Sequence, residues 1–448
     1  MTYRPSTRRQ FLAVSGSAAF AGLAGCTGMG ESNSPTPEQP NETPTGTPDG
    51  TPTETPTPED EGDSALQVET EYRSREQYRQ PGQQFDDFED LLAWTTVGGS
   101  MEADEEVVFD GTQSARLHAE DGENIRIERE IGDEDLTDLD ISFAIRTTTP
   151  GNIAVYVRFV DVYGSSQINQ LRSISYRTPD VGWFRTNPGV FEDDEIPTEM
   201  DQLDRMELVV LNTADEAEVW IDDMRTHEKP DSGYVMLCWD DGFRDYYETA
   251  SPMHDEFGFA TVQAAVRQWT TNEREDVMTI HELLERQEAG DQIVAHGTHQ
   301  RLAEFDADQL EHSLRRDKEW AVNRGLEGGK YLVYPHNSFD STVLDVASKY
   351  YYCGGFNQSG DVNTTGVHGF DPLVLPRTIG WDLDIATRCV DLAADHRNCT
   401  VLNFHAFDQD NTMPEDDYRQ LLEHIDDKGD DVKVITFDEL WELRTSGH

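Results

Sequence analysis

The second half of the chain alternates short apolar runs with helical stretches, and this alternation constrains the fold more than any other feature. Seven runs have the character of strands: residues 234–238, 260–266, 292–295, 330–334, 373–375, 400–404 and 432–436. Strands that alternate with helices form βα units, whose strands run parallel in one sheet. Because the carboxyl ends of parallel strands meet at one edge, residues far apart in the sequence are expected to meet there. The sequence therefore predicts an α/β fold for this half.

Two adjacent carboxylates follow the first of these runs. Asp240 and Asp241, with Gly242 after them, come directly after residues 234–238 and Trp239. In such a pair one carboxylate can bind a cation while the other takes a proton from an attacking water molecule. The pair also has an ordinary structural interpretation, because Asp begins many surface turns and Gly supplies the positive φ that such turns need. Taken alone, the pair fits metal-assisted hydrolysis or a plain turn.

Histidines follow two later runs. His296 and His299 come after residues 292–295 and ahead of a helical stretch over residues 308–323, and His405 ends a later apolar run. Two imidazoles, one carboxylate and an open position make a hydrolytic metal site, and imidazole suits zinc and its neighbours. The alternative is that one histidine caps the following helix while the other is solvated. The order of the motifs favours the metal site. Several acid and histidine motifs in this order are far less expected by chance than any single motif.

From about residue 232 to the C-terminus, these motifs together resemble the polysaccharide deacetylase family, also called carbohydrate esterase family 4, with its NodB-homology domain. The resemblance implies a deformed (β/α) barrel with catalytic groups at the C-terminal ends of its strands. It also implies a divalent metal, and the His and Asp ligands favour zinc. The roles that it implies are a general base at Asp240, metal ligands at Asp241, His296 and His299, and a general acid at His405.

The resemblance also implies substrate contacts. Tyr334, Pro335 and His336 stand in the place of a proline motif whose backbone N–H steadies the oxyanion. Such a donor matters because the negative charge appears on the former carbonyl oxygen only as the transition state forms. Trp381 and Asp382 resemble an aromatic wall and the acid that partners the catalytic histidine. Their alternative interpretation is a core Trp beside a surface Asp.

Three positions depart from the family pattern. His296 and His299 are three apart, where the family usually spaces its histidines four apart. Both spacings keep two side chains on one face of a helix, so metal binding is still expected. Val333 stands where the family often has an Arg that orients the catalytic Asp, and the residue that replaces this Arg is not evident from the sequence. His336 and Asn337 replace the usual Tyr-Gly, which a backbone donor tolerates.

The chain carries 89 acidic and 35 basic residues, a formal net charge of −54. Self-repulsion of this size is destabilising in dilute buffer, but molar salt shortens the Debye length to about 3 Å. The composition therefore resembles that of haloarchaeal proteins. The same charge argues against nucleic acid or an anionic lipid surface as a partner, since both would be repelled. An intrinsically disordered acidic protein does not fit either, because aromatic residues and apolar runs are plentiful from Phe85 onward.

The N-terminus resembles a Tat export signal with a lipoprotein cleavage site. A twin-arginine pair at residues 8–9 precedes a short apolar run, and residues 23–26 resemble a lipobox that ends in Cys26. We expect residues 1–26 to direct export and Cys26 to carry lipid, which would be the protein's sole contact with the outer face of the cell membrane. Cleavage elsewhere with free secretion is the alternative. Residues 27–65 are rich in Thr, Pro and acidic residues, which predicts an extended stalk.

Residues 66–230 precede the barrel region, residues 231–448, and have the pattern of an all-β domain. Runs such as 140–145 and 153–159 alternate at period two, which predicts half-buried antiparallel strands in a sandwich. The first and last of these strands resemble those of jelly-roll domains of the carbohydrate-binding or galactose-binding type. Sugar binding and a spacer role are both open. Oxygen ligands at strand ends would also suit a structural calcium ion, and the candidates are Asp86, Asp87, Asp222 and Asp223.

Four cysteines lie beyond Cys26: Cys238, Cys353, Cys389 and Cys399. The last two could pair across a helix and a strand, but ordinary buried thiols are the favoured interpretation. No Cys-x-x-Cys spacing occurs, so a structural zinc site of that kind is unsupported.

The sequence as a whole predicts an exported, lipid-anchored hydrolase that removes N- or O-linked acetyl groups from a cell-surface or extracellular polysaccharide. Both bonds pass through the same tetrahedral oxyanion, so the choice between them stays open. The alternative from a different class is a catalytically silent glycan-binding surface lipoprotein, which Val333 favours. A metal-dependent glycosidase would need a second carboxylate that flanks the bond, and the sequence offers none with a clear place.

Overall fold

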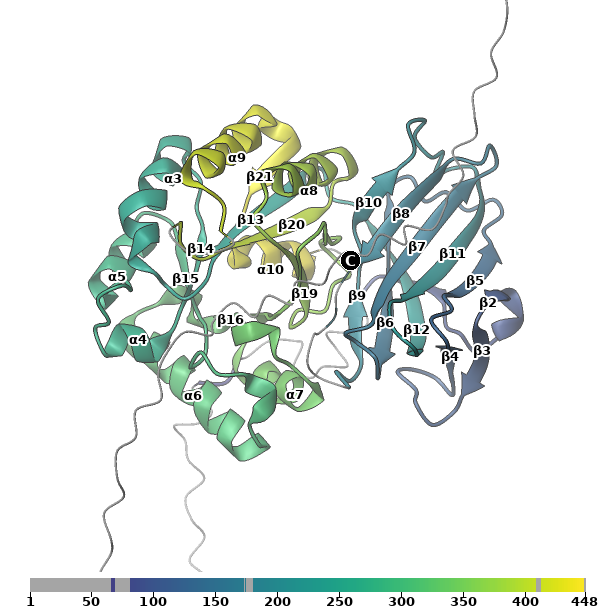
Figure 1. Ribbon diagram of the computed structural model, residues 1–448, viewed down its shortest axis with the longest axis horizontal. Coiled ribbons are helices and arrows are strands. Elements are labelled where there is room, and N and C mark those ends of the chain that lie inside the picture. The colour runs from purple at the N-terminus through teal and green to yellow at the C-terminus, as the bar shows by residue number, and fades with distance from the viewer. Residues whose placement is uncertain (1–65, 69–80, 173, 175–179, 408–411, 447–448) are drawn as a thin grey trace, which may run out of the picture. The chain divides into compact units, whose positions relative to one another are not determined.

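The structure is a computed structural model that describes residues 66–68, 81–172, 174, 180–407 and 412–446. The export signal, the lipobox at Cys26 and the stalk, predicted over residues 1–65, lie outside the described residues. The described residues lie in one compact unit, which contains a β-sandwich and, after it in the chain, a parallel sheet with helices around it (Figure 1). No helix in the described ranges is both long and apolar enough to cross a membrane.

The sandwich consists of two six-stranded antiparallel sheets. Its strands are β1 (Gln83–Asp86), β2 (Thr95–Gly98), β3 (Ser100–Asp104), β4 (Ser114–Ala119), β5 (Ile125–Glu130), β6 (Leu139–Thr147), β7 (Ile153–Asp161), β8 (Ser166–Leu171), β9 (Phe184–Thr186), β10 (Val190–Asp193), β11 (Leu203–Asn212) and β12 (Ala217–Glu228). One sheet has the order β3-β4-β12-β6-β9 with β1 beside β12, and the other has the order β10-β8-β7-β11-β5-β2. Along β7, Val155 and Val157 are buried while Arg158 is half-buried, as the alternating pattern predicted. The jelly-roll type of this region stays a prediction.

A nine-stranded parallel sheet forms the second region. Its strands are β13 (Gly233–Trp239), β14 (Val262–Ala265), β15 (Gln292–Ala295), β16 (Tyr331–Leu332), β17 (Cys353–Gly354), β18 (Phe356–Ser359), β19 (Leu375–Ile379), β20 (Cys399–Phe404) and β21 (Val432–Val434). Their order is β17-β16-β15-β14-β13-β20-β19-β18, with β21 beside β13, and this nearly closed sheet fits a deformed barrel. All seven residues of β13 are buried, as expected of a parallel strand that is covered on both faces.

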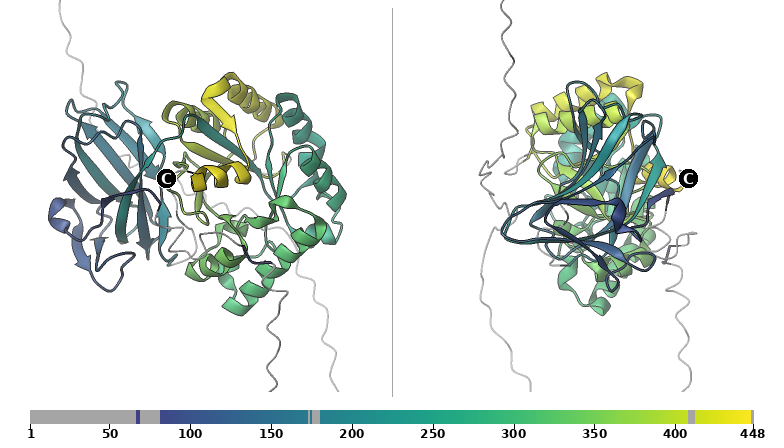
Figure 2. Two further views of the ribbon diagram at one scale, coloured as in Figure 1. Left: turned by 180° about the vertical axis from the view of Figure 1, so that it is seen from behind. Right: turned by 90° about the vertical axis from the view of Figure 1, so that its right-hand side faces the viewer.

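Helices surround this sheet (Figure 2). They are α3 (Ser251–Phe257), α4 (Arg267–Thr271), α5 (Ile280–Glu288), α6 (Ala307–Arg324), α7 (Ser341–Tyr350), α8 (Leu383–His396), α9 (Glu415–Asp427) and α10 (Phe437–Ser446). The chain also makes a π-helical turn at Tyr246–Ala250 and 3₁₀ turns at Leu91–Ala93, Leu302–Glu304, Glu327–Lys330, Pro335–Asn337 and Gly429–Asp431. Helix α6, expected over residues 308–323, begins at an Asp306 capping box and ends at Gly325, whose φ is 73°.

The structure departs from the sequence expectations at three places. The short strands β17 and β18 were not expected from the sequence. The strand expected at residues 373–375 begins later, as β19. His296 and His299 do not lie on a helix, because the chain turns after β15, with φ of 58° at both Gly297 and His299. The prediction that the two histidines share one face of a helix is therefore wrong. All four cysteines beyond Cys26 are buried free thiols, the favoured interpretation.

The loop before β19 is hydrogen-bonded to the sandwich within the same compact unit. The Arg172 N–H donates to the Asn363 side chain at 3.0 Å, and the Gly189 N–H donates to the Thr364 carbonyl at 2.9 Å. The Asn363 N–H in turn donates to the Thr378 hydroxyl on β19 at 3.1 Å. The sandwich thus supports the loop that leads into β19.

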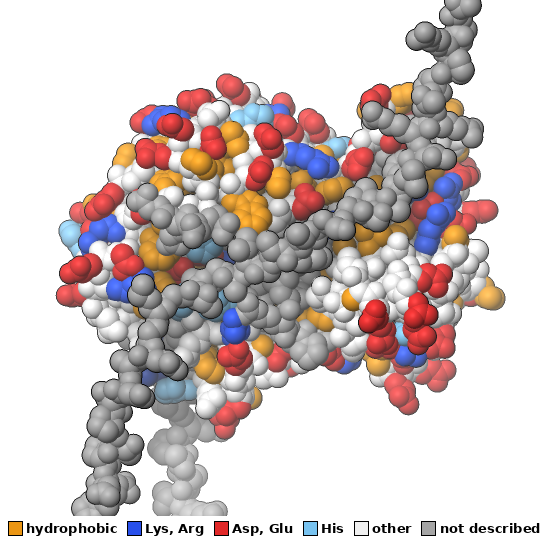
Figure 3. Space-filling view, in the orientation of Figure 1, with side chains coloured by type: hydrophobic (Ala, Val, Ile, Leu, Met, Phe, Trp, Pro, Cys, Tyr) orange, Lys and Arg blue, Asp and Glu red, His pale blue; other side chains and the backbone are white. Residues whose placement is uncertain are grey.

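Acidic side chains dominate the charged groups on the face shown in Figure 3. This distribution follows from the 89 acidic residues of the chain. A surface of this kind is tolerated best where salt screens its repulsion.

Candidate active site at the C-terminal end of the parallel strands

Strands β13, β15 and β20 of the barrel bring the predicted residues to one end of the sheet. Asp240 and Asp241 follow β13, His296 follows β15, and His405 follows β20. The Asp240 N–H donates to the Phe404 carbonyl at 2.9 Å, which fixes the end of β13 against the end of β20. The meeting of distant residues expected from parallel strands is therefore present in the structure.

Asp240 is 2% exposed and accepts contacts on both carboxylate oxygens. Arg377 of β19 donates from Nη1 to Oδ1 at 3.2 Å and from Nη2 to Oδ2 at 2.9 Å. The Cys238 thiol donates to Oδ1 at 3.6 Å, and His405 Nε2 lies 4.0 Å from Oδ2. Burial acts to raise the pKa of Asp240, but Arg377 and two nearby histidines outweigh it and hold that pKa below its usual value. Asp240 is therefore an ionised carboxylate.

Asp241 lies between the two predicted histidines. Its Oδ1 is 3.4 Å from His296 Nε2 and 3.2 Å from His299 Nδ1. Burial opposes ionisation of Asp241, but its bonds to both imidazoles hold its pKa well below the usual range. Burial likewise acts to lower the pKa of His296, and the two neighbouring carboxylates reverse this and raise it. The three side chains form one closely packed polar group.

The two histidines present different nitrogens to Asp241. His296 uses Nε2, and its Nδ1 lies 3.0 Å from the Val333 carbonyl. Because a carbonyl only accepts, Nδ1 of His296 carries the proton and Nε2 is free to bind a cation when the ring is neutral. His299, in its left-handed conformation, turns Nδ1 toward Asp241, and its ring lies 4.3 Å from the ring of Trp269.

Whether these residues fit a metal ion depends on their chemistry and spacing. No group of three or more His, Cys, Asp or Glu side chains in the described ranges has the full arrangement of a metal site. The donor set nevertheless matches in kind, because two imidazoles and one carboxylate are zinc ligands. Two ligand atoms of one tetrahedral zinc ion lie about 3.4 Å apart, and the two nitrogens lie 3.4 and 3.2 Å from Asp241 Oδ1. Asp241, His296 and His299 are therefore a set that an ion would draw together.

The proline motif lies beside this group. Tyr334 and Pro335 are buried, and His336 is exposed with a φ of 58°. His336 Nε2 lies 3.3 Å from the His299 carbonyl, and the two imidazole rings are 4.8 Å apart. The motif is thus at the site, and the oxyanion role of its backbone stays a prediction.

Asp382 has a structural contact in this molecule. Its carboxylate accepts the Ile385 N–H at 3.0 Å and caps α8. Among the described contacts of His405 there is an ion pair with Asp240 and none with Asp382. Trp381 is half-buried, and it lies against Gly360, where an added Cβ would come within 2.9 Å of the indole. The predicted roles of Trp381 and Asp382 toward substrate and His405 stay predictions.

A small hollow lies beside His405. It is lined by Trp239, Ile379, Gly380, Asn403, Phe404, His405, Ala406, Phe407, Thr412 and Met413. Most of these side chains are apolar, and Trp239 packs against Phe404 and Phe407 with ring centroids 5.3 and 5.4 Å apart. The hollow suits a small apolar group next to a titratable imidazole.

Sequence reasoning missed Arg377 and Trp269. Arg377 lies directly after Pro376, beyond the run expected to form the strand, so nothing in the local pattern pointed it into the barrel. Trp269 lies on α4, far in sequence from the histidine that it contacts. One signal in the sequence could have led to Arg377: Val333 stands where the family often has an Arg, so another residue was needed to orient Asp240.

The acids proposed as calcium ligands in the sandwich do not form one site. Asp86 accepts the Trp94 indole N–H at 2.9 Å and pairs with Arg129. Asp223 pairs with Arg185 and Arg225, and Asp222 accepts two backbone N–H groups. Asp87 is exposed and accepts the Glu89 N–H at 3.2 Å. The calcium expectation is not supported here, since these oxygens already accept hydrogen bonds and the described residues hold no metal group.

Residues 227–354 match the family model described as polysaccharide deacetylase. The chain therefore carries a polysaccharide deacetylase domain. The matched segment contains Asp240, Asp241, His296, His299 and Pro335, and it ends before Arg377 and His405.

The structure also has remote likenesses among solved structures. A Streptococcus pyogenes deacetylase in complex with acetate is 18% identical with a TM-score of 0.28, covering 32% of this chain and 63% of that chain. A putative polysaccharide deacetylase from Mycobacterium smegmatis is 14% identical with a TM-score of 0.38, covering 48% and 92%. A family 11 carbohydrate-binding module from Clostridium thermocellum is 16% identical with a TM-score of 0.26, covering 32% and 93%. No curated protein matches the chain. Likenesses this remote assign no substrate.

Proposed function

We propose that this protein removes acetyl groups from a polysaccharide by metal-assisted hydrolysis. The observation that carries the proposal is the meeting of an ionised Asp240, the Asp241–histidine group and His405 at one end of a parallel sheet. The segment that supplies four of these residues matches the deacetylase family model. The acetyl group is N-linked or O-linked, and the glycan belongs to the cell surface or its surroundings.

Asp240 is the proposed general base. It is ionised and its two oxygens are held by Arg377, yet a carboxylate has about four acceptor positions, so room remains for a water molecule. A buried carboxylate with a fixed orientation takes a proton efficiently when the donor water is within hydrogen-bond reach. Asp240 would therefore accept the proton of the attacking water.

Asp241, His296 and His299 are the proposed ligands of a divalent ion, with zinc favoured by the donor set. When bound, the ion supplies a Lewis acid that polarises the acetyl carbonyl and makes water a better nucleophile. The Val333 carbonyl accepts the Nδ1 proton of His296, so that in the neutral ring Nε2, which faces Asp241, is the nitrogen free to bind the ion. The protein's part is to hold these three side chains together at the mouth.

His405 is the proposed general acid. Its side chain is 36% exposed and lies beside Asp240, so it can reach both the site and bulk water. It would give its proton to the leaving amine or alkoxide, while the backbone near His336 steadies the oxyanion. The apolar hollow beside His405 fits the acetyl methyl group.

The site of action is also a proposal. The Tat-like signal and the lipobox at Cys26 support export and lipid anchoring at the outer face of the cell membrane, and the acidic composition supports function in molar salt. Cys26→Ser should release the protein from the membrane fraction into the medium. Retention of that variant on the membrane would contradict the lipid anchor.

The experiment that tests the function measures bound metal and acetate release together. The chain without its predicted export signal, residues 1–26, is called the exported body. It is purified in molar KCl and given acetylated oligosaccharides, with His296→Ala as the test variant. His281→Ala is the matched control, because that side chain is 81% exposed on α5. We expect one metal per chain and acetate release in the wild type and the control, and neither in His296→Ala. A wild type that binds sugar without metal or acetate release would leave a glycan-binding surface protein.

A further inference from the structure

Arg377 reaches Asp240 from a strand that is not its neighbour. It lies on β19, and β20 separates β19 from β13. Both carboxylate oxygens of Asp240 are nevertheless matched by the guanidinium, at 3.2 and 2.9 Å, and the two side chains are 3% and 2% exposed. A two-point contact of this kind fixes the carboxylate plane as well as its position.

Arg377 is itself held in place from its other side. The ring of Phe356, on β18, lies 4.4 Å from the centre of the guanidinium. This stacking is favourable for a planar cation and restricts its rotation. The loop before β19 is tied to the sandwich through Asn363, which also bonds Thr378, the residue after Arg377. The arginine is therefore held between Asp240 and Phe356.

Cys238 gives Asp240 a third contact from its own strand. Residues two apart on a strand face the same side, so Cys238 and Asp240 both point into the barrel. The Cys238 sulfur lies 3.6 Å from Asp240 Oδ1. Burial raises the pKa of the Cys238 thiol well above its usual value, so the sulfur keeps its proton and donates. The bond is weak on its own, and it restrains the oxygen that Arg377 also holds.

We propose that Arg377 and Cys238 are positioning residues for Asp240, with Arg377 supplying from β19 the orienting charge that Val333 cannot. This inference rests on the proposed function. Val333 and Cys238 belong to one buried apolar cluster, and Val333 carries no charge that could orient Asp240. The arrangement also divides the two acids: Arg377 holds Asp240, and the histidines hold Asp241.

A purely structural ion pair would behave differently from a positioning pair. Loss of a structural pair lowers the stability of the fold and reduces the amount of active protein, without a specific effect on turnover. Loss of a positioning pair lowers kcat in protein that remains folded, because a displacement of about 1 Å costs about 100-fold in rate. KM and bound metal are expected to stay unchanged in that case, since the described contacts of both residues go to Asp240 and Phe356 and not to Asp241 or its histidines.

The test compares Arg377→Lys and Arg377→Met with Arg286→Lys in the full exported body. Arg286 is the matched control because it also pairs with a buried Asp, Asp291, at 2.8 Å, and Asp291 precedes β15 at the opposite end of the sheet. We expect kcat to fall about 100-fold in Arg377→Met and less in Arg377→Lys, with KM within about twofold and metal content unchanged. Arg286→Lys should keep the wild-type kcat.

Cys238→Ala and Cys238→Ser extend the test to the thiol. Cys238→Ala should lower kcat about three- to tenfold, and Cys238→Ser should restore it because the hydroxyl is a donor. Arg377→Lys keeps the inference testable if Arg377→Met does not fold. The inference is overturned if both Arg377 variants keep kcat within about threefold of the wild type, or if they lose the metal. A wild type without acetate release would instead overturn the proposed function.

Discussion

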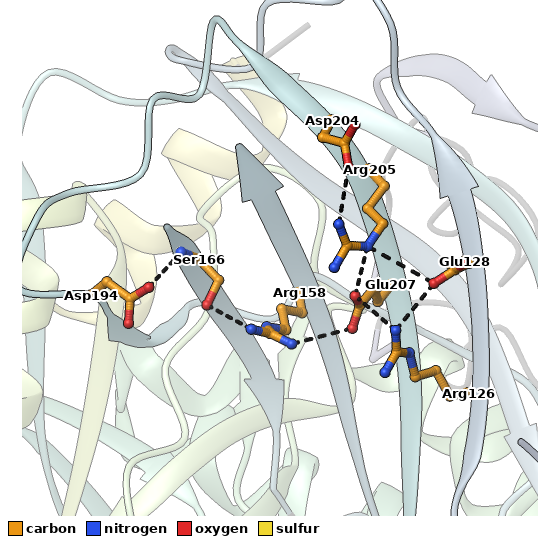
Figure 4. A network of polar contacts seen from close by, with 8 residues as sticks. All are labelled: Arg126, Glu128, Arg158, Ser166, Asp194, Asp204, Arg205 and Glu207. Carbon is orange, nitrogen blue, oxygen red and sulfur yellow. Dashed lines mark hydrogen bonds and ion pairs between the residues drawn. The ribbon is translucent and has the colours of Figure 1, made fainter. Parts of the chain in front are cut away.

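Two buried carboxylates, Glu207 in the sandwich and Asp240 in the barrel, have similar partners and different surroundings. Glu207 is 1% exposed in the middle of β11 and contacts Arg126, Arg158 and Arg205 from three strands (Figure 4). Asp240 is 2% exposed just beyond the end of β13 and contacts one arginine. Beyond its arginine, Asp240 faces the half-buried imidazole of His405 at 4.0 Å.

The difference shows that burial and pairing do not by themselves mark a functional acid. The charged groups around Glu207 neutralise one another in ion pairs, because Arg205 also pairs with Asp204 and Arg126 also pairs with Glu128. A carboxylate in the middle of a strand is enclosed by its neighbours, whereas one beyond the end of a strand borders the mouth. Position relative to the strand end thus distinguishes Asp240, the proposed general base, from Glu207.

The largest effect that would test this contrast comes from neutralising each acid in turn. Asp240→Asn should lower acetate release by at least about 10³-fold, because a general base contributes 10²- to 10⁴-fold and the amide also leaves Arg377 without its charged partner. Glu207→Gln should leave kcat unchanged. Steady-state acetate release in molar KCl checks both, and equal losses in the two variants would remove the contrast.

The next effect concerns the nitrogen that each histidine presents. An Asn side chain places its polar atom near Nδ1 of a histidine, and a Gln side chain reaches toward Nε2. Because His299 presents Nδ1, His299→Gln should weaken metal binding by at least about 100-fold and His299→Asn by less. Because His296 presents Nε2, the order should reverse at that residue. Metal affinity from chelator competition measures this, and the same order at both residues would argue against the assignment.

In the sandwich the corresponding loss is one of stability. Glu207→Ala leaves three arginines together without the buried acid between them. Breaking a buried pair costs 3–5 kcal/mol, and because the arginines are about one-third exposed, we expect a loss of about 2–3 kcal/mol. Urea unfolding in KCl measures the change, with the exposed Glu216→Ala as control. A change in kcat in refolded Glu207→Ala would link the network to the active site.

The acids and histidines of the site were predictable because each stands at the end of an apolar run. The pattern of buried strands fixes where β13, β15 and β20 end, and Asp240, His296 and His405 follow those ends directly. Helix α6 was predictable for the same kind of reason, since Asp306 and Gly325 cap a periodic segment.

Other features were not predictable because they depend on tertiary contacts. Pro376 lacks an N–H donor and so favours ending a strand, yet β19 continues through it and carries Arg377 inward. His299 takes a left-handed conformation that few non-glycine residues adopt, so a helical spacing was the natural expectation. β17 has two residues, too few to show a period.

The two regions should also differ in how their stability depends on pH. In the barrel, His254 is buried against Tyr418 at 2.7 Å, and burial lowers the pKa of His254 to about 3. Unfolding exposes this histidine, which then binds a proton below its usual pKa of 6.5, so stability is lost as the pH falls from 6.5 toward 3. Between pH 6.5 and pH 5 the loss is about 2 kcal/mol. His254→Gln should remove most of this slope in urea unfolding, and His281→Gln should not.

The sandwich should show the opposite sign at Asp222. Burial raises the pKa of Asp222 to about 7, because its hydrogen bonds from Phe109 and Asp110 only partly offset the loss of water. The unfolded chain holds that carboxyl at its usual pKa of 3.8, so the folded state binds the extra proton between pH 3.8 and 7. The stability that this proton contributes is complete below pH 3.8 and is lost as the pH rises to 7, by about 2–3 kcal/mol between pH 5 and pH 7. In urea unfolding, Asp222→Asn should make the unfolding free energy fall less between pH 5 and pH 7, whatever the variant's stability at any single pH. Asp222→Asn and His254→Gln should change the slope of unfolding free energy against pH in opposite directions. A change in the same direction would contradict the pKa shifts that burial gives the two groups.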